Sequence, residues 1–372
     1  MKDDYSEAAR AADRARILEI ESQIRELQDR IDCLHSERKL AKKRLKAYRY
    51  PVLTLPNEIV SEICVHTLPL YPICPPMAGP SSPTSLAHVC RKWRDIALGS
   101  PELWRAIRFK YAAKHENRQT RAVRSWLDRS GTYPLAIQVG EGRWISSGCL
   151  EAILHHRERW EYVNLVLEDD QTTSIHGSMP LLRSLGLSLN GCRFDRPPPN
   201  ICDFPRLQAV SLSGFPDLAS LPVGQLTSLT LKHMDPRNYL PILQEAVSLI
   251  DLYLVNCGGE DRVHFSLTLP RLEKLVVEHS NSWRPQNLDA FIVPSLCTLQ
   301  VWCEVLGDFH EAFASLITRS GCTLQHVLVT GDLPQGFSTS AFLREFPGIR
   351  KIAFDNGYNW SEDGYHSWED SE

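Results

Sequence analysis

The sequence predicts an α/β protein with a long N-terminal coiled-coil helix, a small helical unit and an irregular solenoid built on a parallel sheet. Three observations predict this: a heptad pattern in the first fifty residues, helix signals on both sides of a proline-rich stretch, and a short apolar unit that recurs nine times. The 372 residues are enough for two to three domains of about 150 residues each. The expected divisions are residues 1–49, 50–109, 110–355 and an acidic polar tail at 356–372.

Residues 5–48 are expected to form one helix, because no proline or glycine interrupts them. Apolar side chains recur at the a and d positions of a heptad, a pattern broken by Arg38. The seam consists of Ile17, Ile20, Ile24, Leu27, Ile31, Leu34, Ala41, Leu45 and Tyr48. We expect a coiled coil with a second copy or another protein. A helix folded back on its own chain is an alternative, as is a nuclear-localisation or nucleic-acid patch at the basic end.

Residues 50–109 show the signals of short helices around a loop. Pro56 suits the first position of a helix, and Ile59, Val60, Ile63 and Cys64 follow it at one-turn spacing. Residues 69–85 hold six prolines and are expected to be an inserted surface loop. A second helix is expected from about Ser85 to Gly99, and a short third one starts at Ser100 and Pro101 and leads into residues 102–109. The apolar face of the helix from Ser85 to Gly99 would carry Leu86, Val89, Cys90, Trp93, Ile96 and Ala97.

From residue 160 onward the pattern apolar-x-x-apolar-x-apolar repeats, with starts 19 to 28 residues apart. The nine units start at Trp160, Leu182, Leu207, Leu226, Leu249, Leu272, Leu296, Leu324 and Ile349. This spacing lies in the range of leucine-rich repeats, and each unit predicts a short strand followed by an irregular or helical return. Stacked units would form one parallel sheet. Residues 121–139 predict a helix and a strand that cap the N-terminal end of the repeats.

Composition, net charge and missing motifs exclude several classes of function. The net charge of −4 gives no basic footprint for nucleic acid, and no stretch is apolar enough to span a membrane. The N-terminus lacks the apolar core of a signal peptide, and the 11 cysteines form no Cys-x-x-Cys pair. We therefore expect an intracellular protein, cytoplasmic or nuclear. Phosphate-binding loops, dinucleotide fingerprints, nucleophile–base pairs and zinc spacings are absent, so no catalytic residue, cofactor or metal site is expected.

Residues 51–109 resemble the F-box motif. The matching residues are Leu55-Pro56-x-Glu58-Ile59, Ile63, Leu68, Val89-Cys90-Arg91-x-Trp93-Arg94 and Pro101-x-Leu103-Trp104, in the order that F-box proteins show. The loop at 69–85 is longer than the compact motif allows. With the repeats that follow, the chain resembles many fungal F-box proteins with leucine-rich repeats.

The resemblance implies the substrate-recruiting subunit of an SCF-type cullin–RING ubiquitin ligase, which performs no chemistry itself. Its F-box would bind a Skp-type adaptor, and through it a cullin, while the repeats hold the target protein. The residues expected at the adaptor are Leu55, Pro56, Glu58, Ile59, Ile63, Val89, Cys90 and Trp93. Two other functions remain open: a repeat scaffold without a ligase role, and an enzyme that uses scattered cysteines and histidines.

Four side chains on consecutive repeat strands predict a surface for the target protein. They are Tyr253, Val276, Trp302 and Leu328. Each alternates with the apolar core positions of its strand, so the period of two places it on the face opposite the core. These side chains are larger and more apolar than solvent exposure requires, and aromatic residues are enriched at binding hot spots. The alternative is that neighbouring loops or the acidic tail cover them.

Overall fold

The computed structural model describes residues 7–48, 51–110, 115–140, 144–168, 171, 174–189, 204–214, 221–257, 266–278, 288, 290–303, 309–331 and 338–355. The expected acidic tail at 356–372 lies outside the described residues. The chain divides into two compact units, residues 1–60 and 61–372. The boundary between these units falls inside helix α2 (Asn57–His66).

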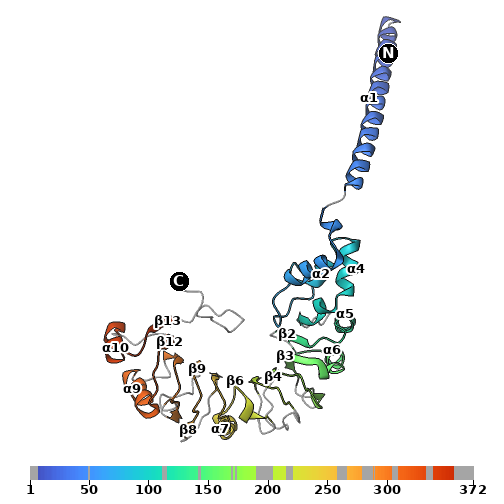
Figure 1. Ribbon diagram of the computed structural model, residues 1–372. Helices are drawn as coiled ribbons and strands as arrows, with labels where there is room; N and C mark the ends of the chain where they lie inside the picture. Colours follow the sequence, from blue (N-terminus) through green and yellow to red (C-terminus); the bar gives the residue numbers. More distant parts are fainter. Residues whose placement is uncertain are drawn as a thin grey trace, which may run out of the picture. The chain divides into compact units, whose positions relative to one another are not determined.

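Helix α1 (Glu7–Ala47) spans 41 residues without interruption, as the sequence predicted (Figure 1). Its a and d side chains from Ile17 to Leu34 are between 41% and 63% exposed. The helix therefore presents its apolar seam to solvent along most of its length. A 3₁₀ turn, η1 (Pro51–Thr54), leads to the start of α2.

The helical part of the second unit contains α3 (Pro83–Leu86), α4 (Arg91–Gly99) and the 3₁₀ turn η2 (Pro101–Trp104). The prediction of one helix from Ser85 to Gly99 was wrong, because Cys90 has an extended backbone (φ −158°, ψ 175°). Cys90 instead caps α4: its Sγ accepts a 3.5 Å hydrogen bond from the Trp93 backbone N–H. Apolar spacing continues across this break, so periodicity alone could not reveal it.

The proline-rich loop at 69–85 packs against the sheet. The Arg108 backbone N–H donates to the Pro75 carbonyl oxygen at 2.8 Å, and Pro76 forms a parallel bridge with Arg108. Cys74 and Ser82 are buried, and the Ser82 side chain caps α3. The insertion therefore joins the edge of the sheet, although the sequence predicted only a surface loop.

The main sheet contains eleven parallel strands among the described residues, side by side in Figure 1. They are β1 (Ala106–Phe109), β2 (Leu135–Val139), β3 (Trp160–Leu167), β4 (Ser184–Leu189), β5 (Ala209–Ser213), β6 (Ser228–Lys232), β7 (Asp251–Val255), β9 (Lys274–Glu278), β11 (Thr298–Trp302), β12 (His326–Thr330) and β13 (Lys351–Asp355). A small parallel sheet pairs β8 (Leu267–Thr268) with β10 (Phe291–Ile292).

Each of the nine predicted units contributes one strand, from β3 to β13, and neighbouring strands pair in parallel. The strands form because apolar residues alternate, as in β6, where Leu229 and Leu231 are buried between half-buried neighbours. The register aligns Leu229 with Leu252 and Leu252 with Leu275. These leucines form continuous layers that a single unit could not bury.

Strands β1 and β2 extend the sheet on its N-terminal side. The predicted helix and strand near 121–139 are α5 (Glu116–Arg129) and β2, and α6 (Ser147–Leu154) packs beside α5. The end strand is β1, which comes from the helical region. Residues 106–109, expected to continue a short helix, form a strand instead, since Ala106, Ile107 and Phe109 are buried in the sheet while Arg108 is exposed.

Several connections between strands contain helices. They are α7 (Pro236–Leu243), α9 (Phe309–Ser320) and α10 (Thr339–Glu345), with the 3₁₀ turns η4 (Arg157–Arg159) and η6 (Val223–Gln225). Figure 1 shows α7, α9 and α10 on the same side of the row of strands. The opposite face of the strands carries no helix among the described residues.

Candidate adaptor-binding surface

Helix α2 divides its apolar residues between two environments. Val60 and Cys64 are fully buried, and burial raises the pKa of the Cys64 thiol. Ile59 is 49% exposed and Ile63 is half-buried. The four residues share one-turn spacing, yet only Val60 and Cys64 belong to the core. Ile59 is therefore available to another protein.

The start of α2 gathers the first four predicted adaptor residues. Pro56 precedes the helix and its carbonyl oxygen accepts the Val60 backbone N–H at 3.2 Å. Glu58 lies in the first turn, where a carboxylate is stabilised by the helix dipole. Pro56, Glu58 and Ile59 are exposed and Leu55 is half-buried.

The break between α3 and α4 gathers the predicted residues Val89, Cys90 and Trp93. Val89 is 60% exposed, whereas Cys90 and Trp93 are half-buried. The Arg94 Nε donates a 3.0 Å hydrogen bond to the Ala87 carbonyl oxygen, which holds the two short helices together. Within the described part of the chain, the Trp93 indole N–H is buried without a hydrogen-bond partner. The break thus presents Val89 on a fixed turn.

Trp104 anchors the helical region to the helices beside the sheet. Its Nε1–H donates to the Ala97 carbonyl oxygen at 2.8 Å. Its ring meets Trp126 of α5 edge-on at 4.8 Å, and the Arg129 guanidinium lies 4.7 Å from the ring centroid. Leu103 is buried beside it. The Leu103–Trp104 pair of the motif therefore has a structural role.

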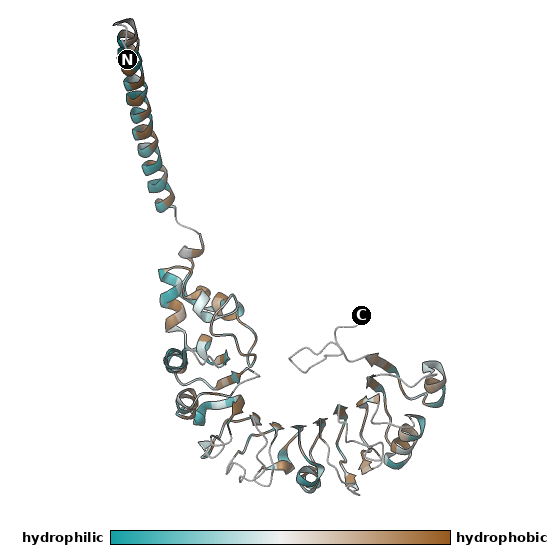
Figure 2. Cartoon of the chain, turned by 180° about the vertical axis from the view of Figure 1, so that it is seen from behind, coloured by the Kyte–Doolittle hydropathy of each residue, from teal (hydrophilic) through white to brown (hydrophobic). Residues whose placement is uncertain are grey.

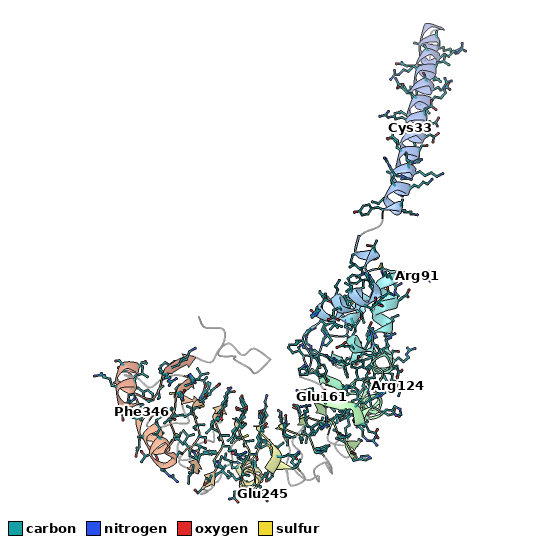
Figure 3. All side chains as sticks on the ribbon, in the orientation of Figure 1. Cys33, Arg91, Arg124, Glu161, Glu245 and Phe346 are labelled. Carbon is teal, nitrogen blue, oxygen red and sulfur yellow. The ribbon has the colours of Figure 1, made fainter. Side chains whose placement is uncertain are left out.

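Tyr71 anchors the proline-rich loop to the strands. Its hydroxyl donates to Glu161 Oε2 at 2.8 Å, and Glu161 Oε1 also lies 2.9 Å from Arg183 Nε. The Arg105 guanidinium covers the Tyr71 ring at 4.2 Å, and Tyr162 meets it edge-on. Burial, followed by the Glu161 hydrogen bond, raises the pKa of Tyr71. Glu161 is labelled in Figure 3.

Sequence reasoning missed this network and several exposed apolar side chains in the residues that match the motif. Leu70 is 84% exposed, and Ile73, one turn later in the same loop, is also exposed. Leu98 on α4 and Val52 before α2 are exposed as well. The loop has no periodicity, so the sequence carried no signal for which of its residues would be buried.

The predicted target-binding residues occupy two rows of the sheet. The register places Tyr253 beside Val276, Val276 beside Gln300, and Gln300 beside Leu328. Trp302 lies one row further along, where it pairs with Thr330. Tyr253, Trp302 and Leu328 are half-buried, but Val276 is only 2% exposed. Lys274 Nζ lies 5.1 Å from the Tyr253 ring centroid, so the Lys274 ammonium group lies over the Tyr253 ring.

The described residues contain no group of three histidine, cysteine or acidic side chains that could hold a metal ion. No described helix has the length and apolar character needed to cross a membrane.

Comparison with known proteins identifies the helical region. Residues 52–110 match the F-box-like family model. The chain carries an F-box-like domain. A search of the curated proteins found no match. F-box domains are typically non-catalytic and bind Skp-type adaptors, so the domain supports an SCF-type substrate-adaptor role in general.

Proposed function

We propose that this protein is the substrate-recruiting subunit of an SCF-type cullin–RING ubiquitin ligase. The observation that carries the proposal is the F-box-like match over residues 52–110, combined with the exposed apolar side chains Ile59 and Val89 within that match. The F-box-like domain binds a Skp-type adaptor and, through it, a cullin. The strands after it bind the target protein.

Exposure divides the eight candidate residues into two roles. Pro56, Glu58, Ile59 and Val89 are exposed, and we assign them to direct contact with the adaptor. Removing the apolar surface of Pro56, Ile59 and Val89 from water favours the complex, and the part of this gain that exceeds the entropy lost on association sets the affinity. Leu55, Ile63, Cys90 and Trp93 are half-buried, and we assign them to supporting the contact surface.

We propose that the strands from β3 to β13 are irregular leucine-rich repeats of the type found in fungal F-box proteins. The aligned leucine layers and the recurring strands support this. Cys257 adds support, because its buried thiol donates to the Leu231 carbonyl oxygen of the preceding unit at 3.2 Å. Burial raises the pKa of Cys257 to about 11, which keeps the thiol a hydrogen-bond donor at neutral pH.

Recruitment works by proximity, and the contacts of the second unit suit it. Trp104 and Tyr71 link residues of the F-box-like match to α5 and β3 through hydrogen bonds and ring contacts. A target held on the strands would therefore keep a limited range of positions relative to this part of the domain. A restricted range raises the effective concentration of target lysines at the conjugating enzyme.

We propose that the target protein binds the face carrying Tyr253, Trp302 and Leu328, where the buried Val276 lies beside Tyr253 in the same row. This face lacks covering helices among the described residues. In cell extracts, Tyr253→Ala with Trp302→Ala should reduce target capture and leave adaptor binding intact. Val247→Ala is the control, because Val247 is exposed outside the strands. Unchanged target capture by the double variant would refute this assignment.

A repeat scaffold without a ligase role is the competing function. Affinity purification followed by mass spectrometry, with and without proteasome inhibition, separates the two. The ligase proposal predicts that a Skp-type adaptor and a cullin co-purify, and that Leu55→Ala with Pro56→Ala removes both. It also predicts these complexes in the cytoplasm or the nucleus. Recovery of partners without an adaptor would favour the scaffold.

A further inference from the structure

Helix α1 exposes a row of apolar side chains that no adaptor or target contact in the proposed function uses. Ile17, Ile24 and Ile31 occupy a positions, and Leu27 and Leu34 occupy d positions. Figure 2 shows hydrophobic and hydrophilic residues alternating along this helix, and Figure 3 shows side chains on all sides of it. An apolar stripe confined to the a and d positions of a heptad favours a second helix as its partner.

The charged residues at a and d positions of α1 indicate which helix is the partner and how it is oriented. Arg10 and Arg38 occupy a positions and Asp13 occupies a d position, so the same stripe contains both signs. In a parallel pair of identical helices each of them would face its own copy, which places like charges together three times. Like charges in contact oppose association.

An antiparallel pair removes all three conflicts. In antiparallel coiled coils the a position of one helix packs against a d position of the other. When Ile24 is set against Leu27 of the second copy, Arg38 faces Asp13 of the second copy and Arg10 faces its Ala41. The same register keeps every central layer apolar, with Ile17 against Leu34 and Ile20 against Ile31.

The flanking positions agree with this register. Arg16 and Glu37 are both at g positions, and the antiparallel register brings Arg16 of each helix beside Glu37 of the other. Arg16 now forms an exposed pair with Glu19, at 2.6 Å, which it can exchange at little cost because surface pairs contribute about 0–1 kcal/mol. A parallel pair would also form attractive flanking contacts, so the core positions decide the orientation.

We propose that α1 joins two copies of this chain as an antiparallel coiled coil, with Arg38 of each copy paired to Asp13 of the other. The pairing is independent of the adaptor and target contacts. The protein would then present two F-box-like domains and two target-binding faces in one assembly. Two linked binding sites increase the retention of targets that carry more than one site.

Charge reversal on the full-length chain tests the pairing. Sedimentation velocity should give wild type twice the 42.3 kDa mass of one chain. Arg38→Asp or Asp13→Arg alone should raise the dissociation constant about tenfold or more, because each creates two like-charge contacts. The double variant Asp13→Arg with Arg38→Asp should regain wild-type affinity, and it controls for folding of the helix.

Disulfide mapping tests the orientation. The variant Asp13→Cys with Arg38→Cys should oxidise to bridges that join position 13 of one copy to position 38 of the other. A monomeric wild type, single variants that dimerise like wild type, or bridges joining 13 to 13 and 38 to 38 would each overturn the proposal. Adaptor co-purification is measured separately, so failure here leaves the ligase assignment unaffected.

Discussion

The Tyr71 hydroxyl donates a 2.8 Å hydrogen bond to Glu161, a residue 90 positions later in the chain. Tyr71 belongs to the proline-rich loop inside the F-box-like match, and Glu161 belongs to β3. Arg183 on the far side of Glu161 completes a chain of Arg, Glu and Tyr. The long insertion therefore connects the F-box-like domain to the sheet through side-chain contacts.

Removing the Tyr71 hydroxyl tests whether its hydrogen bond to Glu161 stabilises the protein. Tyr71→Phe should lower the free energy of unfolding by about 1–3 kcal/mol, because Glu161 loses a donor in a partly buried site. Urea unfolding followed by tryptophan fluorescence measures the change. Tyr133→Phe, on an exposed tyrosine, should stay within about 0.5 kcal/mol of wild type. Equal effects of the two variants would show that the Tyr71 hydroxyl does not stabilise the loop.

Trp104 should be among the costliest residues to replace. Trp104→Ala empties a buried site between Ala97, Trp126 and Arg129, and large-to-small changes of this kind cost about 3–5 kcal/mol. Trp144→Ala, at an exposed position, is the matched control. Thermal unfolding by circular dichroism compares the two. A Trp104 variant as stable as the Trp144 variant would contradict the packing described.

Asp235 should stabilise α7 in a pH-dependent way. It accepts the Arg237 backbone N–H at 2.9 Å, and the Arg237 side-chain hydrogen bond lowers its pKa. A lowered pKa means that the stabilisation is complete at neutral pH and is lost in acid, as the pH falls below the ordinary value of 3.8 through the lowered pKa. Asp235→Ala should cost about 1 kcal/mol at pH 7.

The control for that prediction is Asp235→Asn, which keeps a capping side chain but cannot ionise. It should retain most of the neutral-pH stability and lose the acid dependence contributed by this site. Urea unfolding from pH 7 to pH 3 measures both quantities. An acid dependence identical to wild type in the asparagine variant would show that another group is responsible.

Cysteine reactivity should follow burial. Cys33 on α1 is exposed, whereas burial raises the pKa of Cys74 to about 12 and that of Cys257 to about 11. Iodoacetamide at pH 8 should therefore modify Cys33 much faster than the other two, because the thiolate is the reactive form. Peptide mass spectrometry gives the rates, and addition of urea should equalise them. Comparable rates in the native protein would contradict the burial of Cys74 and Cys257.

Local patterns predicted most of the architecture. The uninterrupted heptads predicted α1, and alternating leucines such as Leu229 and Leu231 predicted nine strands, because each pattern depends on nearest neighbours along one element. The motif residues from Leu55 to Trp104 predicted the domain that the family match supports. The eight adaptor residues and the target face remain predictions.

Features that depend on distant residues were not predictable. The pairing of Tyr71 with Glu161 joins a loop without periodicity to a strand. No sequence pattern around either residue indicates that the two are in contact. The break at Cys90 was hidden because Leu86, Val89 and Trp93 keep helical spacing across it. Residues 106–109 were assigned to a helix because four residues are too few to distinguish the two periods.

Binding to a Skp-type adaptor tests the central claim most directly. The measurement is calorimetric titration of the purified full-length protein with the adaptor, for wild type, for Ile59→Glu with Val89→Glu, and for Val247→Glu. Ile59 and Val89 are exposed, so the double variant should fold normally while placing charges in the contact. The ligase account predicts that wild type and the Val247 variant bind alike and that the double variant loses at least about a hundredfold in affinity. Wild type that does not bind the adaptor, or a double variant that binds as tightly as wild type, would contradict it.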